Sequence, residues 1–518
     1  MAESLRGMVS TAHPSATQAS LKILREGGNA IDAAMAGAWA ISVCEPSGSG
    51  LGGQTTMLIH FPDGKRLVLD GHSYGPAGVS TKSVKSSSQR IGYKATTIPS
   101  TVATLGMAGS RFGKLPLAQV MAPAIELAEN GYPVTRLFRK QVQWCRAQLL
   151  KNPAAEAILF RDGKVIKRRE LFRQPQLALT LKRLSSAGAD DFYRGEIARE
   201  IVADMSRNGG LITADDLAGL AVPIQHEPIS TQFRGYEIVS VPPPGGGLQL
   251  LQALKVLELI DLDASDPNAW YETIARVMQV VYRDRLSWPF KPDEMTDSMH
   301  RWLVGADRAA ELAQQVRAER KQEVIEDDED EGDTTHLCVA DESGMVVSLT
   351  QSIQSLYGAK VASDKLGFFY NNYLSTIPRH GKFLSLVGNV APRSNAAPTM
   401  VFDSNNKSTP IMALGAAGSR RITSSVMQVI ANTLVHGLAI GEAVDAPRIH
   451  GTLSGKAYVE RRVATEEMVR RLGNSFHVVE VKAARSYSMG GVQAIARDGH
   501  GVWTASADPR REGTSSGL

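Results

Sequence analysis

A threonine at the start of a predicted strand is the residue in this sequence best placed to do covalent chemistry. Seven of the eight residues from Glu326 to Asp333 are carboxylates, and Thr334 follows them directly. Two apolar runs come next, 337–340 and 345–349, separated by a turn sequence Asp-Glu-Ser-Gly. This pattern predicts a disordered acidic loop that leads into a β-hairpin whose first strand begins at the threonine.

Such a threonine suits a precursor that cleaves itself. The Thr334 hydroxyl would attack the carbonyl of Asp333, and hydrolysis of the resulting ester would leave Thr334 with a free α-amine beside its own hydroxyl. That amine can then serve as the base for the nucleophile. The residues alone leave a second interpretation open, in which an acidic, solvated surface loop precedes an ordinary hairpin.

The composition is that of a soluble globular protein. The chain has 518 residues, 43% of them hydrophobic and 21% charged, which suffices for one large domain or two ordinary ones. The net charge of +4 is small and the basic residues are spread along the chain, so we expect no nucleic-acid partner. Cys44, Cys145 and Cys338 lack metal-type spacing, and we expect buried thiols in a reducing compartment.

The sequence predicts neither a signal peptide nor a membrane span. Residues 1–7 lack the apolar core of a signal peptide, and the most apolar stretch, 33–44, is too short to cross a bilayer. We therefore expect a cytoplasmic protein with no membrane partner.

The elements that must position the threonine alternate between helices and strands. Helices are predicted at 16–26 and 30–43, and the second is rich in alanine and therefore suited to burial against a close neighbour. A glycine-rich loop, 46–53, leads into a hairpin of strands 55–61 and 65–70. Because the loop lacks the Lys-Ser/Thr ending of a P-loop, we interpret it as close backbone packing near a site.

Further elements complete the pattern. Helices are expected at 116–130, 174–186, 248–260, 268–285 and 422–436, with a helix cap at 213–216. Strands are expected at 235–241, 367–370, 399–402, 410–414, 492–496 and 502–505. Because the strands lie together on either side of the helical blocks, a layered α+β sandwich is favoured.

Short motifs occur in a fixed order along nearly the whole chain. They are Gly27–Ala34, Ser49–Gly53, Ala122–Ala128, Leu211–Thr213, the proline corner at Pro242, Thr334–His336, Asn371-Asn372, Ala446–Arg448 and Ala507–Arg511. Together they resemble the γ-glutamyltranspeptidase family of N-terminal-nucleophile hydrolases. The resemblance implies a four-layer αββα sandwich that cuts itself before Thr334. It implies a large subunit, 1–333, with an acidic disordered linker around 323–333, and a small subunit, 334–518, which together form one structural domain.

The resemblance also implies catalytic roles. Thr334 is the nucleophile and its α-amine the general base. Family members take their oxyanion donors from a glycine pair after a strand, here Gly418 and Ser419, and a backbone N–H survives the change to serine. A second hydroxyl, 18 residues after the nucleophile, falls on Ser352.

Two amide side chains are assigned to substrate contact in the same way. Gln354 takes the place of an amide that touches substrate in the family, and Asn372 lies in a retained Asn-Asn pair. On their own such residues are ordinary polar groups of strands and loops. Their spacing from Thr334 is what marks them as candidates.

The amino-acid pocket of the family is altered in this sequence. γ-Glutamyl enzymes hold the substrate's α-carboxylate with an arginine and a serine pair, and its α-amine with an aspartate. His72 stands at the arginine position and Ser394-Asn395 at the serine pair. Thr376 stands at the aspartate position, and Tyr373 of the same stretch is a further candidate contact. Histidine cannot form an arginine's bidentate contact, and a threonine forgoes a charge-assisted bond of about 1.5–3 kcal/mol.

One compensation lies close to the altered pocket. Arg393 precedes the serine-pair position and Arg420 lies beside the oxyanion loop, so either could replace the carboxylate clamp. The substrate would then be a small amide acid without the amino group, such as an oxamate-like compound or a dicarboxylic monoamide. The alternatives are that both arginines are surface residues, and that His72 donates to a neutral acceptor or is a buried, satisfied histidine.

We therefore expect a self-processing amidohydrolase that acts on a small-molecule amide outside the standard γ-glutamyl class, with hydrolysis favoured over transfer. A γ-glutamyltranspeptidase or glutathione hydrolase with a rebuilt clamp is the first alternative, and an uncleaved, non-catalytic binding protein is the second. We expect no metal or organic cofactor, because nucleophile, base and oxyanion donors are all protein groups. The two subunits of one precursor are expected to form a higher homo-oligomer of the heterodimer.

Overall fold

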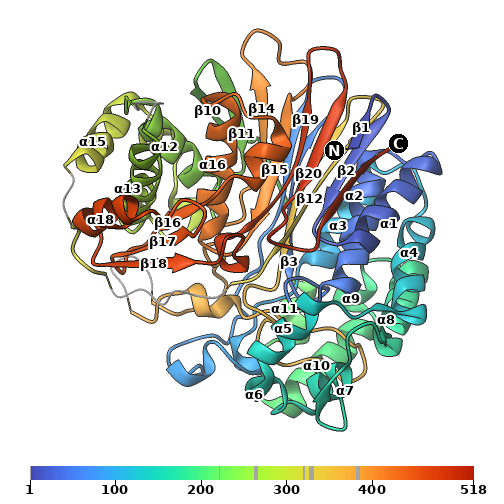
Figure 1. The fold of residues 1–518 in the computed structure, drawn as a ribbon. Coiled ribbons are helices and arrows are strands. Elements are labelled where there is room, and N and C mark those ends of the chain that lie inside the picture. Colours follow the sequence, from blue (N-terminus) through green and yellow to red (C-terminus); the bar gives the residue numbers. More distant parts are fainter. Residues whose placement is uncertain (1, 221, 262–265, 319–320, 326–331, 381–384) are drawn as a thin grey trace.

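The computed structural model describes residues 2–220, 222–261, 266–318, 321–325, 332–380 and 385–518. Residues 326–331, more than half of the predicted acidic linker, therefore lie outside the described residues. The described chain forms two stacked β-sheets with helices on both outer faces, as Figure 1 shows.

The first sheet contains the hairpin that follows Thr334. Its strands lie in the order β21 (Thr514–Gly517), β2 (Gly7–Thr11), β12 (Thr335–Asp341), β13 (Val346–Ser352), β3 (Gln54–His60), β4 (Arg66–Gly71) and β9 (Ile224–His226). The predicted hairpin is confirmed as β12 and β13, an antiparallel pair in which Thr335 lies opposite Gln351. The start of β12 therefore lies beside the end of β13.

The second sheet packs face to face on the first. Its strands lie in the order β1 (Ala2–Ser4), β20 (Trp503–Ala507), β19 (Gly491–Arg497), β15 (Met412–Ala417), β14 (Thr399–Asp403), β11 (Tyr236–Ser240) and β10 (Ile229–Phe233). Apolar side chains of both sheets fill the space between them, among them Met8, Leu58, Val346, Met400, Phe402 and Ile495. Because side chains alternate along a strand, each sheet presents a second apolar face to a helical layer.

Helices cover the two outer faces (Figure 1). On the side of the first sheet lie α1 (Pro14–Arg25), α2 (Ala30–Cys44), α3 (Thr101–Phe112) and α4 (Leu117–Asn130). On the side of the second lie α12 (Gly247–Glu258), α13 (Pro267–Arg285), α15 (Ala306–Arg317) and α16 (Arg421–Leu434). Every residue of the alanine-rich α2 is buried, as its composition predicts. The predicted four-layer αββα sandwich is confirmed.

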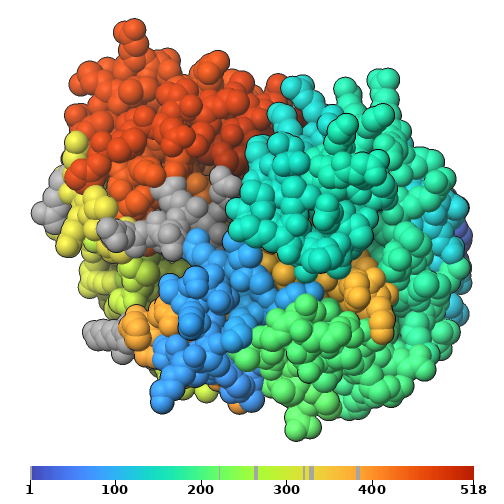
Figure 2. All heavy atoms as spheres, turned by 90° about the horizontal axis from the view of Figure 1, so that it is seen from below, coloured from blue at the N-terminus to red at the C-terminus, as the bar shows by residue number. Residues whose placement is uncertain are grey.

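The remaining elements of the described chain extend these layers. The helices are α5 (Arg136–Trp144), α6 (Arg146–Leu149), α7 (Pro153–Leu159), α8 (Pro175–Ala187), α9 (Asp191–Arg194), α10 (Glu196–Asn208), α11 (Ala214–Ala218), α14 (Asp297–Leu303), α17 (Ile440–Asp445) and α18 (Glu466–Ser475). The strands are β5 (Tyr132–Pro133), β6 (Phe160–Arg161), β7 (Lys164–Val165), β8 (Leu171–Phe172), β16 (Ile449–Gly451), β17 (Lys456–Glu460) and β18 (Val478–Lys482). From below, Figure 2 shows segments far apart in sequence meeting at one face, from blue near the N-terminus to orange and red near the C-terminus.

Most predicted elements occur within one or two residues of their expected bounds, but the strand predicted at 367–370 is wrong. Only isolated bridges occur there, from Tyr370 to Gly52 and from Phe369 to Ala362. The stretch begins at a glycine with φ 75°, and its aromatic side chains are buried in the core on the helical side of the first sheet. Its aromatic residues serve core packing here, and because aromatic residues are also frequent in strands, the composition of the loop resembled that of a strand.

Both sheets combine strands from before and after the Asp333–Thr334 bond. In the first sheet, β12, β13 and β21 follow the bond and the other four strands precede it. In the second, β1, β10 and β11 precede it and the other four follow. A cut at this bond would therefore leave the two parts joined by sheet hydrogen bonds and a shared core.

The three cysteines are buried thiols that form no disulfide, and their burial was predicted. Among the described residues, no helix combines the length and the apolar character needed to cross a bilayer. Nor does the described part of the chain contain a group of three or more histidine, cysteine, aspartate or glutamate residues that could hold a metal ion.

Candidate active site

Two hydroxyl groups converge on the carbonyl of Asp333. Thr334 Oγ1 lies 2.7 Å from the Asp333 carbonyl oxygen and 3.0 Å from Ser352 Oγ, and Ser352 Oγ donates to the same carbonyl at 2.9 Å. The hairpin explains this, because Thr334 directly precedes β12 while Ser352 ends β13 beside it. Thr334 is only 5% exposed. The sequence-predicted pair is thus brought together at the predicted cleavage bond.

A buried salt bridge fixes the residue before that bond. Arg511 Nη1 donates to Asp333 Oδ1 at 2.6 Å, and the Thr334 N–H donates to the same oxygen at 3.0 Å. Ser47 and Gln141 donate to Asp333 Oδ2 at 3.3 and 3.4 Å. The Asp333 side chain is fully buried, so these contacts hold its carboxylate, and with it the adjacent carbonyl, in one orientation.

The glycine-rich loop after α2 packs against the same bond. A Cβ atom at Gly48 would lie 3.0 Å from Asp333 Oδ2 and 3.4 Å from the Thr334 nitrogen. At a second loop residue, Gly53, a Cβ atom would lie closer still, in steric overlap with the carbonyl oxygen of Ser352. The predicted close backbone packing of this loop is confirmed, and it occurs beside the Asp333–Thr334 bond.

A second carboxyl group lies in this buried cluster. Burial raises the pKa of Glu45 to about 8, with the Asp333 carboxylate adding to the shift and Arg511 opposing it. One oxygen of Glu45 has no hydrogen-bond partner among the described residues. The cluster therefore places two acids against one arginine.

The predicted oxyanion loop joins β15 to α16 and touches the segment before the bond. Gly418 has φ 123° and Ser419 has φ 51°, both in the left-handed region. The Ser419 side chain packs directly against Gly332, which leaves no room for a Cβ there. The loop thus lies one residue from Asp333, at the start of a helix whose first N–H groups are positively polarised.

Tyr373 connects the two hydroxyl groups to the altered pocket. Burial raises the pKa of its phenol, and hydrogen bonding to Ser352, Gln54 and Ser394 partly offsets that rise. The Asn372 side chain, in contrast, is bonded to neighbouring segments of the fold. Its Nδ2 donates to the Arg90 carbonyl at 3.0 Å and to the Ser355 hydroxyl at 3.1 Å. Tyr373 therefore lies beside Ser352, whereas the Asn372 side chain is bonded to neighbouring parts of the fold.

Most of the remaining predicted residues line a single cavity of about 440 Å³. It is lined by Gln354, Thr376, Arg393, Asn395, Ser419 and Arg420, together with the unpredicted Arg90 and Arg285. No aspartate or glutamate lies among its described lining residues. We call it the arginine cavity. The arginine cavity ends near the predicted nucleophile. Gln354, one of its lining residues, donates its N–H to Ser352 Oγ at 2.9 Å, and Ser352 Oγ is in turn bonded to Thr334 Oγ1.

Arg285 and Arg393, two of the four arginines that line the arginine cavity, are hydrogen-bonded only to uncharged groups. Arg285 donates to side-chain oxygens of Gln249 and Asn395 and to the Ser394 carbonyl, at 2.7–2.8 Å. Burial lowers its pKa to about 10. Within the described chain no carboxylate pairs with it, so its positive charge is not compensated locally.

Arg393, the predicted clamp, is built into the cavity wall. Its Nη atoms donate to three main-chain carbonyls of residues 285–289 at 2.7–3.2 Å. Burial, and then the charge of Arg285, lower its pKa to about 9. The surface role left open for Arg393 is therefore wrong. Both arginines remain protonated at neutral pH and make the cavity electropositive.

His72 is not brought to the arginine cavity. It is buried in the wall of a different cavity of about 640 Å³, where its Nδ1 is bonded to Asp70. Its Nε2 has no hydrogen-bond partner among the described residues. Thr376 and Asn395 line the arginine cavity instead. The three positions that hold a glutamyl head group in the family are therefore divided between two cavities.

Comparison with known proteins agrees with this architecture. The family model described as "Gamma-glutamyltranspeptidase" matches residues 16–518. The chain belongs to this family. It is 31% identical to the glutathione hydrolase proenzyme of Bacillus subtilis, over 99% of this chain and 91% of that protein. It is 33% identical to the acylase ACY 1 proenzyme of Pseudomonas sp. strain SE83, over 98% of this chain and 93% of that protein.

Among solved structures, the cephalosporin acylase of Bacillus halodurans superposes with a TM-score of 0.87 at 28% identity, covering 99% of this chain and 96% of that one. Membership in the γ-glutamyltranspeptidase family makes this chain an N-terminal-nucleophile amide hydrolase. Its similarity extends to glutathione hydrolases and to acylases alike, so membership alone does not select the substrate.

The sequence identified Asp333 as the residue before the cleavage bond, but it did not indicate the charged groups around its carboxylate. Arg511 occurs in the motif Ala507–Arg511, and nothing local connects it to Asp333, which lies far away in the sequence. Glu45 precedes the glycine-rich loop directly, which was a usable signal. Arg285 ends a long amphipathic helix, and nothing local distinguishes it from a surface arginine.

Proposed function

We propose that this chain cleaves itself between Asp333 and Thr334 and then hydrolyses a dicarboxylic monoamide. In the first step the Thr334 hydroxyl adds to the Asp333 carbonyl, the peptide C–N bond breaks, and the nitrogen takes the hydroxyl proton. Water then hydrolyses the ester, leaving a new carboxyl group on Asp333 and a free α-amine on Thr334. The hydrogen bond from Ser352 to that carbonyl supports this step, because it polarises the oxygen where negative charge develops. The Thr334 hydroxyl lies beside the same carbonyl, as its nucleophile must.

The free amine and hydroxyl of Thr334 would then turn over substrate. The amine takes the hydroxyl proton while Oγ1 attacks the amide carbonyl, and the N–H groups of Gly418 and Ser419 stabilise the oxyanion. Collapse breaks the amide C–N bond, the amine half leaves with the proton, and an ester to Thr334 remains. Water attacks that ester, with the amine again as base, and the acid is released.

The positive charge of the arginine cavity is the observation that supports a dicarboxylic monoamide as substrate. Its described lining includes four arginines and no carboxylate, which suits an anionic acyl group. Thr376 offers a hydroxyl that already donates to the Tyr373 carbonyl at 3.0 Å, and so provides no charge for an ammonium group. A γ-glutamyl group without its amino group is a glutaryl group. Glutaric monoamides, with shorter diacid or oxamate-like amides as variants, are the proposed substrates.

A γ-glutamyl hydrolase with a rebuilt clamp is the second candidate. The similarity to a glutathione hydrolase over almost the full chain favours it. In that case an arginine of the cavity would take over the α-carboxylate, and the ammonium group would be held without a carboxylate.

Intact mass measurement tests the first step. Purified wild-type protein is expected as two fragments split before Thr334, and a Thr334→Ala variant as one chain. A wild type that stays whole would overturn the catalytic proposal and favour the binding-protein alternative. Ser352→Ala should slow processing by about a hundredfold, since it removes one donor to the developing oxyanion.

Two substrates that differ only in the amino group test the second step. Processed enzyme is expected to show a higher kcat/KM for glutaryl 4-nitroanilide than for γ-glutamyl 4-nitroanilide. Thr376→Asp should reverse that preference by about tenfold or more, because it supplies the missing carboxylate. Thr376→Asn, equal in size but uncharged, is the matched control. An enzyme that prefers the γ-glutamyl compound would establish the second candidate instead.

A further inference from the structure

A second cavity reaches the same bond. It has a volume of about 640 Å³ and is bordered by Gly332, the residue before Asp333, and by Gly418 of the oxyanion loop. The arginine cavity meets the neighbouring residues, Gln354 and Ser419. Two separate cavities of a size suited to small molecules therefore end at one reactive bond.

Aromatic rings and cations form the walls of this second cavity. Its aromatic residues are Trp144, Tyr458 and Tyr487, and its cationic residues are Arg421, Lys482 and Arg511. Among the described lining residues there is no aspartate or glutamate. The cations lie over the rings, with Lys482 Nζ 4.4 Å from the centre of Tyr458. We call it the aromatic cavity.

The arginine nearest the bond is only partly satisfied. Arg511 Nη1 is bonded to Asp333, but Nε and Nη2 are buried and have no hydrogen-bond partner in the described chain. The side chain as a whole is 99% buried and lies 3.7 Å over the ring of Tyr487. Buried N–H groups of a charged side chain are costly when they are unpaired, so this wall is suited to an acceptor that enters from the cavity.

We propose that the aromatic cavity receives the amine half of the substrate, and that this half is a planar or aromatic amine carrying a carboxylate. The proposal rests on the function proposed above, in which the arginine cavity holds the acyl half. A cleaved amide has two halves, and the aromatic cavity is a second space that reaches the oxyanion loop. Rings stack on a planar amine, while Lys482 and Arg511 bind its carboxylate.

The binding energy is expected to come from two separable contacts. Tyr458 would contact any aromatic amine, whereas Lys482 would distinguish an anionic amine from a neutral one. Lys482 also pairs with Glu480, which is half exposed, so its charge is shared with solvent and its effect on substrate is moderate.

Three substrates with one acyl group separate these contacts. They are the glutaryl amides of 4-aminobenzoate, of aniline and of ammonia, tested on the processed enzyme. Lys482→Gln should lower kcat/KM about fivefold for the aminobenzoate amide and leave the other two unchanged. Tyr458→Leu should lower kcat/KM about fivefold for both aromatic amides and leave the primary amide unchanged. Lys407→Gln removes the same charge at a residue outside the cavity and serves as the matched control.

The outcomes distinguish this inference from the function on which it rests. A processed wild type that hydrolyses all three amides, with equal effects of Lys482→Gln on each, would overturn the amine site and leave the acyl assignment standing. Failure to process, or failure to hydrolyse any glutaryl amide, would overturn the proposed function itself. The predicted pattern of selective losses would establish both.

Discussion

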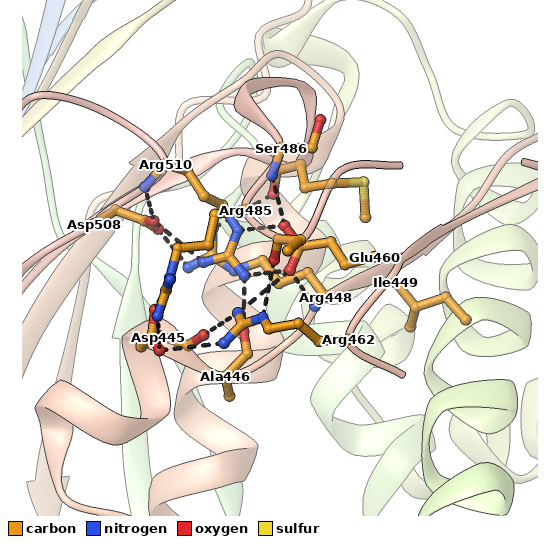
Figure 3. Close-up of polar contacts among 12 residues, drawn as sticks. Asp445, Ala446, Arg448, Ile449, Glu460, Arg462, Arg485, Ser486, Asp508 and Arg510 are labelled. Carbon is orange, nitrogen blue, oxygen red and sulfur yellow. Dashed lines mark hydrogen bonds and ion pairs between the residues drawn. The ribbon is translucent and has the colours of Figure 1, made fainter. Parts of the chain in front are cut away.

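Arg510 and Arg511 are neighbours in the chain, yet their guanidinium groups enter two different buried clusters. Arg510 joins a network with Arg448, Glu460 and Asp508, drawn in Figure 3. Arg511 turns the other way, to Asp333 beside the predicted cleavage bond. The two clusters have the same kinds of groups and nearly the same burial, so their differences show what each is for.

The Arg510 cluster is balanced. Arg510 contacts Glu460 at 2.5 Å and Asp508 at 3.2 Å, and Arg448 contacts Asp508 at 2.5 Å. Two arginines therefore face two carboxylates, and further N–H groups donate to main-chain carbonyls. Burial alone would raise the pKa of Asp508, but Arg448 and Arg510 hold it below its usual value. Only Arg448 Nε in this cluster is buried without a hydrogen-bond partner among the described residues. A network with balanced charges and most of its N–H groups bonded is typical of a structural role.

The Arg511 cluster is not balanced. One arginine faces the two acids Asp333 and Glu45, and both Arg511 and Glu45 keep buried atoms without hydrogen-bond partners among the described residues. Burial, and after it the charge of the neighbouring Asp333, raise the pKa of Glu45, so this acid is readily protonated. An excess of buried acids over cations, with unbonded polar atoms, is expected more often at catalytic sites than in structural cores.

The largest expected effect follows from breaking the balanced cluster. Arg510→Met leaves Glu460 without its main partner in a dry interior and should lower the free energy of unfolding by about 3–5 kcal/mol. Urea unfolding in the uncleaved Thr334→Ala background measures it. Arg485→Met is the matched control, because its bond to Asp445 lies at the exposed end of the network and should contribute less than about 1 kcal/mol. Equal unfolding midpoints for the two variants would contradict the structural role.

The two clusters also differ in how far the sequence predicts them. Thr334 was predictable from the residues, because it stands where an acidic loop meets a hairpin, whereas Ser352 was assigned through the family resemblance. The antiparallel pairing of that hairpin explains why the two lie side by side. The packing of the glycine-rich loop was predictable for a similar reason, since glycines allow close backbone approach. Contacts such as that between Asp333 and Arg511 depend on how the two sheets stack, which no local pattern encodes. Arg393 shows the same limit: its position was foreseen, but its bonding to main-chain carbonyls was not.

A pH-dependent effect of intermediate size is expected at Glu45. Its pKa is raised from 4.5 to about 8 in the folded chain, mainly by burial. The folded chain therefore holds a proton that the unfolded chain has lost between these two values, and stability falls as the pH rises through that window. Glu45→Gln cannot lose a proton and should gain roughly 1–3 kcal/mol over wild type between pH 5 and pH 8. Below about pH 4.5 the difference should vanish.

Urea unfolding of both proteins at four pH values, again in the Thr334→Ala background, measures this difference. Glu460 of the balanced cluster provides the contrast with Glu45. It is also fully buried, but Arg510 donates to both of its carboxylate oxygens. Parallel stability curves for Glu45→Gln and its parent between pH 5 and pH 8 would show that Glu45 is ionised throughout and that the two clusters do not differ in this respect.

The last expected effect concerns Arg511 and appears in the rate of cleavage. Without the guanidinium, the Asp333 carboxylate can take up a proton or shift, and its carbonyl is no longer held between the hydroxyls of Thr334 and Ser352. Misplacement of a reacting carbonyl is expected to slow the step about tenfold for Arg511→Met, measured as the half-time of the precursor on denaturing gels. Arg511→Lys keeps the charge and should recover part of the rate. Arg510→Met should cleave at nearly the wild-type rate at low temperature despite its lower stability. If Arg510→Met slows cleavage as much as Arg511→Met does, the two neighbouring arginines act through one shared structure, and the division between a structural cluster and a reactive one is wrong.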